Sequence, residues 1–255
     1  MPIEIVTVPC LSDNYAFLLH DPDTQQTALV DAPDAEAIIS ELDTRGWTLT
    51  HILLTHHHWD HVDGTEALRQ KYKPQVFGAK ADAHRLPPLD LALSDGQLFS
   101  FAGHEFQTID VSGHTIGHVA FFAPSLNAIF TADSLMALGC GRLFEGSPEQ
   151  MFSSLSKLAQ LPETTIVYSG HEYTESNARF AITVDPDNAA LKARISWIEQ
   201  ARAQNKPTVP SELSLELATN PFLRCDTAGV RNAVGLANAP APDVFTEVRK
   251  RKDNF

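Results

Sequence analysis

The sequence predicts a layered α/β domain followed by a small helical domain. In the first two thirds of the chain, short apolar runs typical of strands alternate with amphipathic helical stretches, the pattern of layered α/β folds. From about residue 173 the strand pattern disappears and the remaining stretches are helical. We therefore expect one domain over residues 1–173 and a second, helical domain over residues 174–255.

The predicted strands are short apolar runs bounded by turn residues. They span Ile3 to Val8, Tyr15 to Leu19, Thr27 to Val30, His51 to Leu54, Phe106 to Ile109, Val119 to Phe122, Ala128 to Thr131 and Thr165 to Tyr168. The predicted helices span residues 34–45, 63–72, 148–161, 175–184, 188–204 and 244–252. We expect Asp63 to cap the second helix and Pro148 to stand in the first turn of the third.

Composition limits the class of protein. Nineteen basic and thirty-two acidic residues give a net charge of −13, which repels polyanions and argues against nucleic-acid binding. No apolar run is long enough to span a bilayer and the start of the chain does not resemble a secretory signal, so we expect a cytoplasmic protein. The three cysteines are predicted to be free thiols, and the chain is expected to act as a monomer.

The most informative stretch lies where an apolar strand runs into several imidazoles and carboxylates, at residues 53–64. His56 and His58 are two residues apart, so an extended backbone projects them to the same side. The turn into the next helix can then bring Asp60 and His61 to a second position. Imidazole together with carboxylate suits zinc, iron or manganese rather than calcium or magnesium.

Three further segments place a histidine or an aspartate after a strand-like run, where sites in layered α/β folds collect. The residues are His114 in GHTIGH, Asp133 in FTADS and His171 in SGHE. A cluster of histidines alone could be a surface feature, but these segments weaken that interpretation. His57 and His118 fall outside the alternation and are expected to support the ligands or to pack beside them.

The order HxHxDH, GHTxGH, an aspartate after an apolar strand and a final GH resembles the metallo-β-lactamase superfamily. This resemblance implies an αββα sandwich with a metal centre at one edge. Its residues, carried over by motif, imply seven ligands. His56, His58 and His114 would hold the first ion, Asp60, His61 and His171 the second, and Asp133 both.

Other segments resemble glyoxalase II, the hydroxyacylglutathione hydrolases, in its bacterial form. They are Asp13-Asn14-Tyr15, residues 139–146, residues 170–174 and the basic end of the chain, residues 249–255. In that family such segments contact glutathione. The resemblance therefore implies that its carboxylates and amides are bound by Arg142, Tyr173, Asn177, Arg249 and Lys252. Arg142 and Phe144 depart from the eukaryotic pattern, in which a lysine and a tyrosine are common.

The resemblance implies that the protein hydrolyses S-D-lactoylglutathione and other 2-hydroxyacyl-glutathiones, the second step of methylglyoxal detoxification. Two divalent ions, zinc or alternatively iron or manganese, would generate the attacking hydroxide, with Asp60 as ligand and orienting base. Two alternatives remain open from the sequence. One is another enzyme of this fold, such as a glutathione persulfide dioxygenase, and the other is a non-catalytic metal-binding module.

Overall fold

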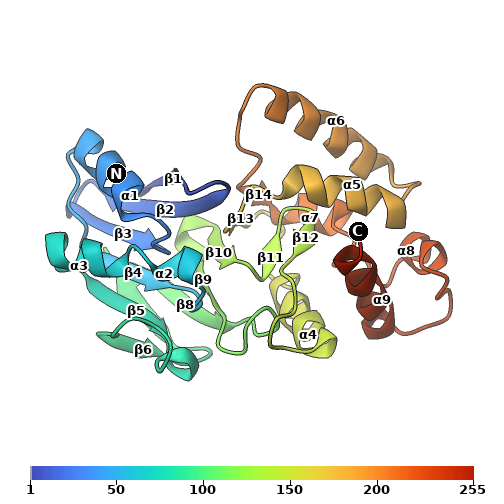
Figure 1. The fold of residues 1–255 in the computed structure, drawn as a ribbon, viewed down its shortest axis with the longest axis horizontal. Helices are drawn as coiled ribbons and strands as arrows, with labels where there is room; N and C mark the ends of the chain where they lie inside the picture. Colours follow the sequence, from blue (N-terminus) through green and yellow to red (C-terminus); the bar gives the residue numbers. More distant parts are fainter. Residues whose placement is uncertain (1) are drawn as a thin grey trace. The chain divides into compact units, whose positions relative to one another are not determined.

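The structure is a computed structural model that describes residues 2–255, and it divides into two compact units. The first unit comprises the described chain up to Asp110 together with the segment Ile116–Thr131. The second comprises Val111–Thr115 and Ala132–Phe255. Figure 1 shows the first unit as mainly strands and the second as mainly helices.

The first unit contains a mixed six-stranded sheet in chain order. Its strands are β1 (Glu4–Cys10), β2 (Asn14–Asp21), β3 (Gln26–Val30), β4 (His51–Leu54), β5 (Gln75–Ala79) and β6 (Leu91–Leu93). The first three strands pair antiparallel, and β3 to β6 pair parallel. Because parallel neighbours end at the same edge, the residues that follow β3 and β4 come together there.

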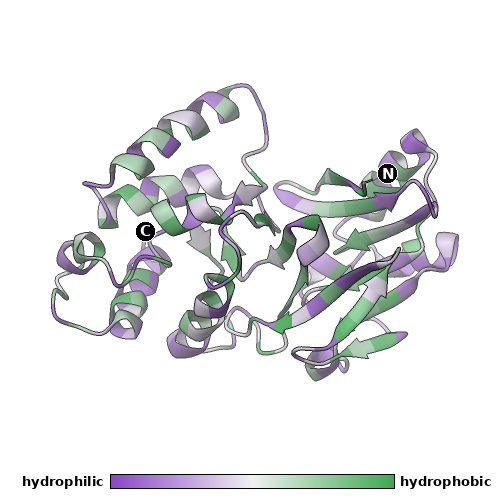
Figure 2. Cartoon of the chain, turned by 180° about the vertical axis from the view of Figure 1, so that it is seen from behind, coloured by the Kyte–Doolittle hydropathy of each residue, from purple (hydrophilic) through white to green (hydrophobic). Residues whose placement is uncertain are grey.

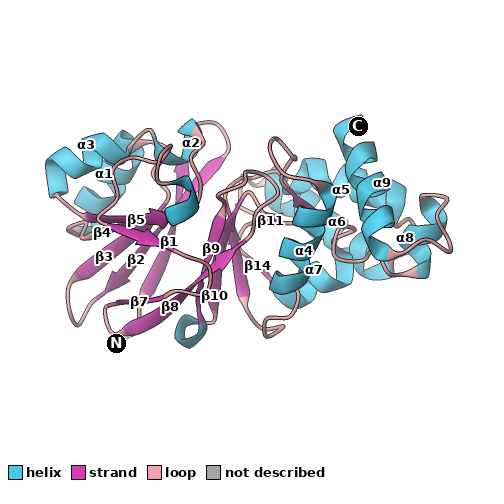
Figure 3. Ribbon diagram, turned by 90° about the horizontal axis from the view of Figure 1, so that it is seen from below, coloured by secondary structure: helices cyan, strands magenta, loops and turns pink. Residues whose placement is uncertain are grey.

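Helices α1 (Ala35–Arg45) and α3 (Thr65–Tyr72) cover the outer face of this sheet, and the one-turn helix α2 (Trp59–Val62) follows the β4 loop. Figure 3 shows α1 and α3 as a layer on the sheet. Ile38, Leu42 and Leu68 pack into one buried cluster with residues of the sheet. Asp34 caps α1 by accepting bonds from two backbone amides in its first turn.

The other face of the sheet packs on strands β7 (Leu98–Phe101), β8 (His104–Asp110), β9 (Val119–Ala123) and β10 (Ala128–Ala132), which are antiparallel neighbours. Short 3-10 turns lie at Lys80–Asp82 and Pro124–Leu126. Aromatic contacts join the layers: Phe17 lies 5.8 Å from Phe130 between ring centroids, and Phe77 lies 5.5 Å from Phe99. The first unit is thus a sheet-on-sheet sandwich with helices outside.

The second unit consists of helices with short strand pairs. Its helices are α4 (Pro148–Leu158), α5 (Thr174–Val184), α6 (Ala189–Ala203), α7 (Leu213–Thr219), α8 (Ala228–Ala233) and α9 (Ala241–Asp253). Its strands are β11 (Leu135–Met136) with β12 (Gly139–Cys140), and β13 (Ile166–Ser169) with β14 (Ser211–Glu212). Figure 2 shows helix α6 with both hydrophilic and hydrophobic residues, and Leu191, Ile198 and Ala201 are its buried apolar side chains.

The eight predicted strands and six predicted helices all have counterparts in the structure. Pro148 stands in the first turn of α4 as expected, and Ser147 caps that helix. The expected cap at Asp63 is wrong, because one turn of helix, α2, already occupies Trp59–Val62 and Asp63 ends it. Gly64 instead precedes α3. Among residues 2–255, no helix combines the length and apolarity needed to cross a membrane.

Candidate metal centre

The loop after β4 carries four of the predicted ligands. His56 and His61 are fully buried. His61 fixes the loop through its backbone, because its carbonyl oxygen accepts a 2.8 Å bond from the amide of Ala32. Gly64 closes the turn where a Cβ would lie 2.9 Å from the Ala32 carbonyl oxygen, so glycine is required by close packing.

Asp31, which follows β3 with a φ of 57°, orients this loop. Its carboxylate accepts bonds from the backbone amide and the hydroxyl of Thr55, each at 2.9 Å, and lies 2.8 Å from His61 Nδ1. An ionised carboxylate only accepts, so His61 carries its proton on Nδ1 and presents Nε2 as a ligand atom. Asp31 also lies near His56, but its oxygens are already engaged, so it positions ligands rather than serving as one.

Ring nitrogens in the loop have the spacing of ligands on one ion. His56 Nε2 lies 3.2 Å from His58 Nδ1. Two nitrogens bound tetrahedrally at about 2.0–2.1 Å from zinc stand roughly 3.3 Å apart. His56 Nδ1 lies 3.0 Å from the Thr55 hydroxyl, which turns the Nε2 atom toward His58. The geometry of these two residues fits a shared cation.

Asp60 is held by Asn14, at the start of β2. The Asn14 amide donates to the Asp60 carbonyl oxygen at 3.0 Å and to its Oδ2 at 3.1 Å. Asn14 is only 4% exposed. The segment 13–15 was expected to contact glutathione by resemblance, but the described contacts of Asn14 go to Asp60. Its amide therefore orients a predicted ligand.

His57 and His118 pack beside predicted ligands. His57 Nδ1 lies 2.9 Å from Asp82 Oδ2, and Arg85 Nε donates to the other oxygen of Asp82 at 2.6 Å. The His118 ring is fully buried and stacks on His56 with centroids 4.5 Å apart and planes at 11°. The His57 ring also lies 5.0 Å from that of His58 between centroids, so both side chains pack against rings of the predicted ligand set.

The second unit contributes three more predicted ligands, each from a loop after a strand. Asp133 Oδ2 lies 3.5 Å from His114 Nε2 and 3.3 Å from His171 Nε2. A carboxylate that faces two imidazole nitrogens at these separations fits a ligand shared between two ions. His114 Nδ1 lies 2.7 Å from the carbonyl oxygen of Arg142 and donates to it, which leaves Nε2 as the ligand atom.

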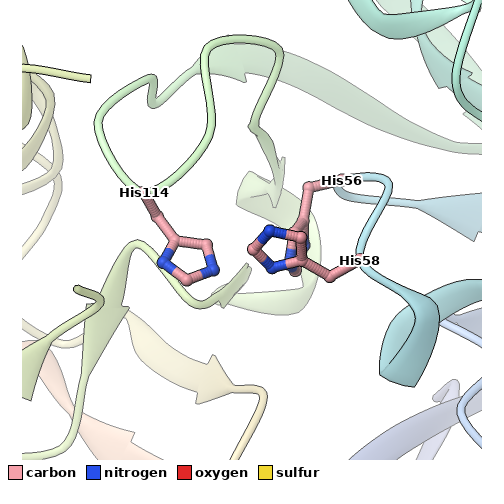
Figure 4. Close-up of side chains that lie close together, drawn as sticks. All are labelled: His56, His58 and His114. Atoms are coloured by element: carbon pink, nitrogen blue, oxygen red, sulfur yellow. The ribbon is translucent and has the colours of Figure 1, made fainter. Parts of the chain in front are cut away.

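The predicted ligands form two groups. The ligand atoms of His56, His58 and His114 all lie within 4.8 Å of one another, and Figure 4 shows these imidazoles close together. The ligand atoms of Asp60, His61 and His171 meet the same criterion. Both groups combine imidazoles, and the second adds a carboxylate, a donor set suited to divalent transition metals. The residues present therefore fit two divalent ions.

The residues predicted to bind substrate all lie in the second unit, with unequal access to solvent. The Arg142 side chain is 59% exposed and lies 3.6 Å from Asp253 through Nε. Tyr173 is 39% exposed. Asn177 is buried and donates to the Ala137 carbonyl oxygen at 3.0 Å.

The basic end of the chain forms the last turns of α9. Arg249 is 5% exposed, and its guanidinium donates to the Cys140 carbonyl oxygen at 3.0 Å and to Asp253 at 2.8 Å. Lys252 Nζ donates to the Ser176 carbonyl oxygen at 3.3 Å and lies 5.4 Å from the ring centroids of Phe180 and Phe255. Burial, reinforced by the nearby positive charge of Arg249, lowers the pKa of Lys252 to about 8.

The cysteines are buried free thiols, as expected. Burial raises the pKa of Cys140 to about 11, although the Arg249 charge opposes that rise. A thiol with that pKa holds little thiolate at neutral pH. Cys140 therefore packs as a small apolar side chain.

Two family models match the chain in succession. Residues 13–171 match the metallo-β-lactamase superfamily, and residues 172–255 match the C-terminus of hydroxyacylglutathione hydrolase. A curated hydroxyacylglutathione hydrolase from Ruegeria pomeroyi is 66% identical over 255 residues, covering 100% of both chains. The match therefore runs through both halves of the chain.

Solved structures share the fold at lower identity. ETHE1 from Myxococcus xanthus superposes with a TM-score of 0.65 at 23% identity, covering 99% of this chain and 98% of that one. A protein called TTHA1623, solved in a di-iron-bound form, gives a TM-score of 0.63 at 26% identity over 86% of this chain and 100% of its own.

Proposed function

The chain belongs to the hydroxyacylglutathione hydrolases of the metallo-β-lactamase superfamily, and we propose that it hydrolyses S-D-lactoylglutathione to D-lactate and glutathione. The predicted αββα sandwich with a helical C-terminal domain is confirmed by this membership. The observation that carries the function is the 66% identity to a hydroxyacylglutathione hydrolase over the whole of both chains. Other 2-hydroxyacyl-glutathiones are substrates of the same class.

Neither alternative is favoured. ETHE1 from Myxococcus xanthus is 23% identical to this chain, so its similarity is evidence for the fold alone and not for an activity. A non-catalytic metal-binding module would not require the C-terminal segment at residues 172–255, which matches the C-terminus of hydroxyacylglutathione hydrolase. We propose that residues 1–173 form the catalytic domain and residues 174–255 the substrate-binding domain. The free, buried thiols support a cytoplasmic location, and we propose a monomer.

We propose that the divalent ions are zinc. His56, His58 and His114 would hold one ion, Asp60, His61 and His171 the other, and Asp133 both; the ligand-atom spacings support this assignment. Bound there, the ions would lower the pKa of a shared water to near 7 and polarise the thioester carbonyl. Asp60, oriented by Asn14, would accept a hydrogen bond from the attacking water and align it.

The leaving thiol needs little assistance. Its pKa is about 8.5, so the thiolate departs near neutral pH without a strong general acid. Cys140 is excluded as a nucleophile, because burial raises its pKa to about 11. The chain's own residues would thus bind the substrate, align the attacking water and hold the metal ligands in position.

We propose that two kinds of residue serve glutathione. Arg142, Tyr173 and Lys252 would contact its carboxylates and amides, since Arg142 and Tyr173 are exposed and Lys252 is partly so. Asn177 and Arg249 are buried with partners inside the unit. We propose that these two buried residues shape the glutathione-binding site from inside the unit.

The test is a comparison of substrates on one preparation. Protein from defined medium is analysed for metals and then assayed for loss of the lactoylglutathione thioester absorbance. We expect two equivalents of divalent metal, hydrolysis of lactoylglutathione, and no oxygen uptake on glutathione persulfide. Oxygen uptake without thioester hydrolysis would establish the dioxygenase, and two bound ions without any turnover would establish the non-catalytic module.

A further inference from the structure

A buried hairpin separates Asp133 from the Gly141-Arg142 turn. Strands β11 and β12 pair antiparallel, with Leu135 opposite Cys140 and Met136 opposite Gly139. Its tip residue Leu138 has a φ of 56°, an uncommon backbone conformation for a leucine. Two-residue strands make few ladder bonds of their own. The hairpin therefore depends on other partners to keep this shape.

Side chains from the helical segment, residues 174–255, supply those partners. Asn220 donates to the carbonyl oxygens of Met136 at 3.1 Å and Gly139 at 3.0 Å. Glu216 accepts the backbone amide of Leu138 at 2.9 Å. Asn177 and Arg249 donate to the carbonyl oxygens of Ala137 and Cys140, each at 3.0 Å. We call Asn177, Glu216, Asn220 and Arg249 the hairpin clamp.

The clamp is itself braced by a buried ion pair. Glu216 is fully buried, and its Oε1 pairs with Arg194, which is 4% exposed. The same oxygen accepts from the Ser211 hydroxyl at 2.6 Å, and Oε2 accepts from the Asn220 amide at 3.2 Å. A buried charge with these partners is costly to disturb, so it restrains the atoms that it contacts.

The far side of the hairpin contacts the ligand loops. The Gly141 amide donates to the Ser134 carbonyl oxygen at 3.2 Å, one residue after Asp133. A Cβ on Gly141 would lie 2.0 Å from the Asp133 carbonyl oxygen and 2.8 Å from His114 Nδ1. The next carbonyl, that of Arg142, accepts from His114 Nδ1 at 2.7 Å. A shift of the hairpin would therefore displace both Asp133 and His114.

We propose that the hairpin clamp positions Asp133 and His114, so that the helical segment sets ligand geometry as well as binding substrate. This inference rests on the proposed function only for the identity of the ions and substrate. The side chains act through backbone groups at Met136 to Cys140 and touch no reacting atom. They are positioning residues.

The test variant is Asn220→Ala, which removes the amide that spans both hairpin strands. We expect kcat on lactoylglutathione to fall about 10 to 100-fold, the usual range for groups that orient metal ligands. KM should change less than about threefold. Retention of zinc against a competing chelator should weaken by a similar factor to kcat, which is a readout independent of turnover.

The matched control is Asn188→Ala. The Asn188 amide also makes two bonds in the second unit, to Asp185 at 2.8 Å and to the Ala218 carbonyl oxygen at 2.9 Å, but neither goes to the hairpin. It should lower the melting temperature without changing kcat or zinc retention. The pair separates general loosening of the unit from a specific effect on ligand geometry.

Unchanged kcat and zinc retention in Asn220→Ala would overturn the proposal, as would equal losses in Asn188→Ala. If Asn220→Ala does not fold, Glu216→Gln keeps the side-chain shape and is judged by the same two readouts. Zinc retention is measured without substrate. A wrong substrate assignment would therefore appear as inactivity of the wild type and leave the chelator comparison intact.

Discussion

The phenol ring of Tyr173 lies parallel to the imidazole of His171, with centroids 4.6 Å apart and planes at 9°. His171 is 3% exposed and Tyr173 is 39% exposed, so the stack covers a predicted ligand with a residue that still reaches solvent. Tyr173, a predicted substrate contact, is thereby in direct contact with a predicted metal ligand.

Two replacements of Tyr173 separate these roles. Tyr173→Phe keeps the ring and loses a hydroxyl, so we expect KM for lactoylglutathione to rise roughly 2 to 10-fold, the value of one neutral hydrogen bond. Tyr173→Ala also loses the stack, worth about 0.5–1.5 kcal/mol, and should lower kcat and zinc retention too. Steady-state kinetics and metal analysis decide. Equal zinc loss in both variants would contradict the role given to the stack.

Asp31→Asn should weaken metal binding by the second group of predicted ligands, Asp60, His61 and His171. The carboxylate that accepts from His61 Nδ1 is replaced by an amide, which also offers donors and no longer fixes the tautomer. We expect a loss of about 10 to 100-fold in affinity for one of two ions, measured by chelator titration. Asp34→Ala is the control: it removes the α1 cap, which should cost about 1 kcal/mol of stability and leave metal binding alone.

The strand and helix pattern was largely predictable, because most of the predicted strands are short apolar runs bounded by turn residues and the predicted helices are amphipathic stretches. The strand β5 was missed: it is a short run interrupted by Gly78, without alternation. Helix α2 was missed because four residues are too few to show a helical period, and its presence moved the expected cap away from Asp63. Local patterns thus fail where an element is too short to show its period, as in α2, or where a glycine interrupts an apolar run, as in β5.

The predicted ligands stand out because histidine and aspartate recur after apolar strands. Asp31 also had a signal in the sequence, because it is an aspartate that directly follows the apolar run of β3. Val30 of β3 pairs in parallel with Leu53 of β4, so Asp31 lies at the same edge of the sheet as the histidine loop. Asn14 is singled out only within a segment whose resemblance implies contact with glutathione, and Asn220 has no signal in the sequence. Their partners, Asp60 and the hairpin, are far away in sequence and are selected by tertiary packing.

Asp133→Ala should abolish activity and disturb both ions, because Asp133 Oδ2 faces His114 and His171 at 3.5 and 3.3 Å. Without it, two cations would face one another unscreened. His118→Ala removes a ring that stacks on His56 and whose Nδ1 lies 3.2 Å from the Val119 carbonyl oxygen, and it should lower activity or metal affinity by about 10 to 100-fold. Metal analysis and kinetics of both variants provide the check. Two full equivalents of metal with near-normal turnover in Asp133→Ala would refute a shared ligand.

If Lys252 binds a substrate carboxylate as proposed, substrate binding should be sensitive to alkaline pH. Its pKa in the free protein is lowered to about 8, first by burial and then by the charges of Arg249 and Arg179. Below pH 8 the ammonium is charged and, in the proposed role of Lys252, would attract a glutathione carboxylate. As pH rises through 8 the charge is lost, so the hydrogen bond falls from the charged range of about 1.5–3 kcal/mol toward the neutral range near 1.

KM for lactoylglutathione should therefore rise roughly fivefold between pH 7 and 9 at constant ionic strength, while kcat changes little, because the bound carboxylate holds the lysine protonated. Lys252→Arg is the matched control, since a guanidinium stays charged throughout this range and its KM should stay flat. Initial rates from pH 6.5 to 9.5, followed by thioester absorbance, give both curves. A wild-type KM as flat as that of the arginine variant would show that Lys252 does not bind the substrate carboxylate.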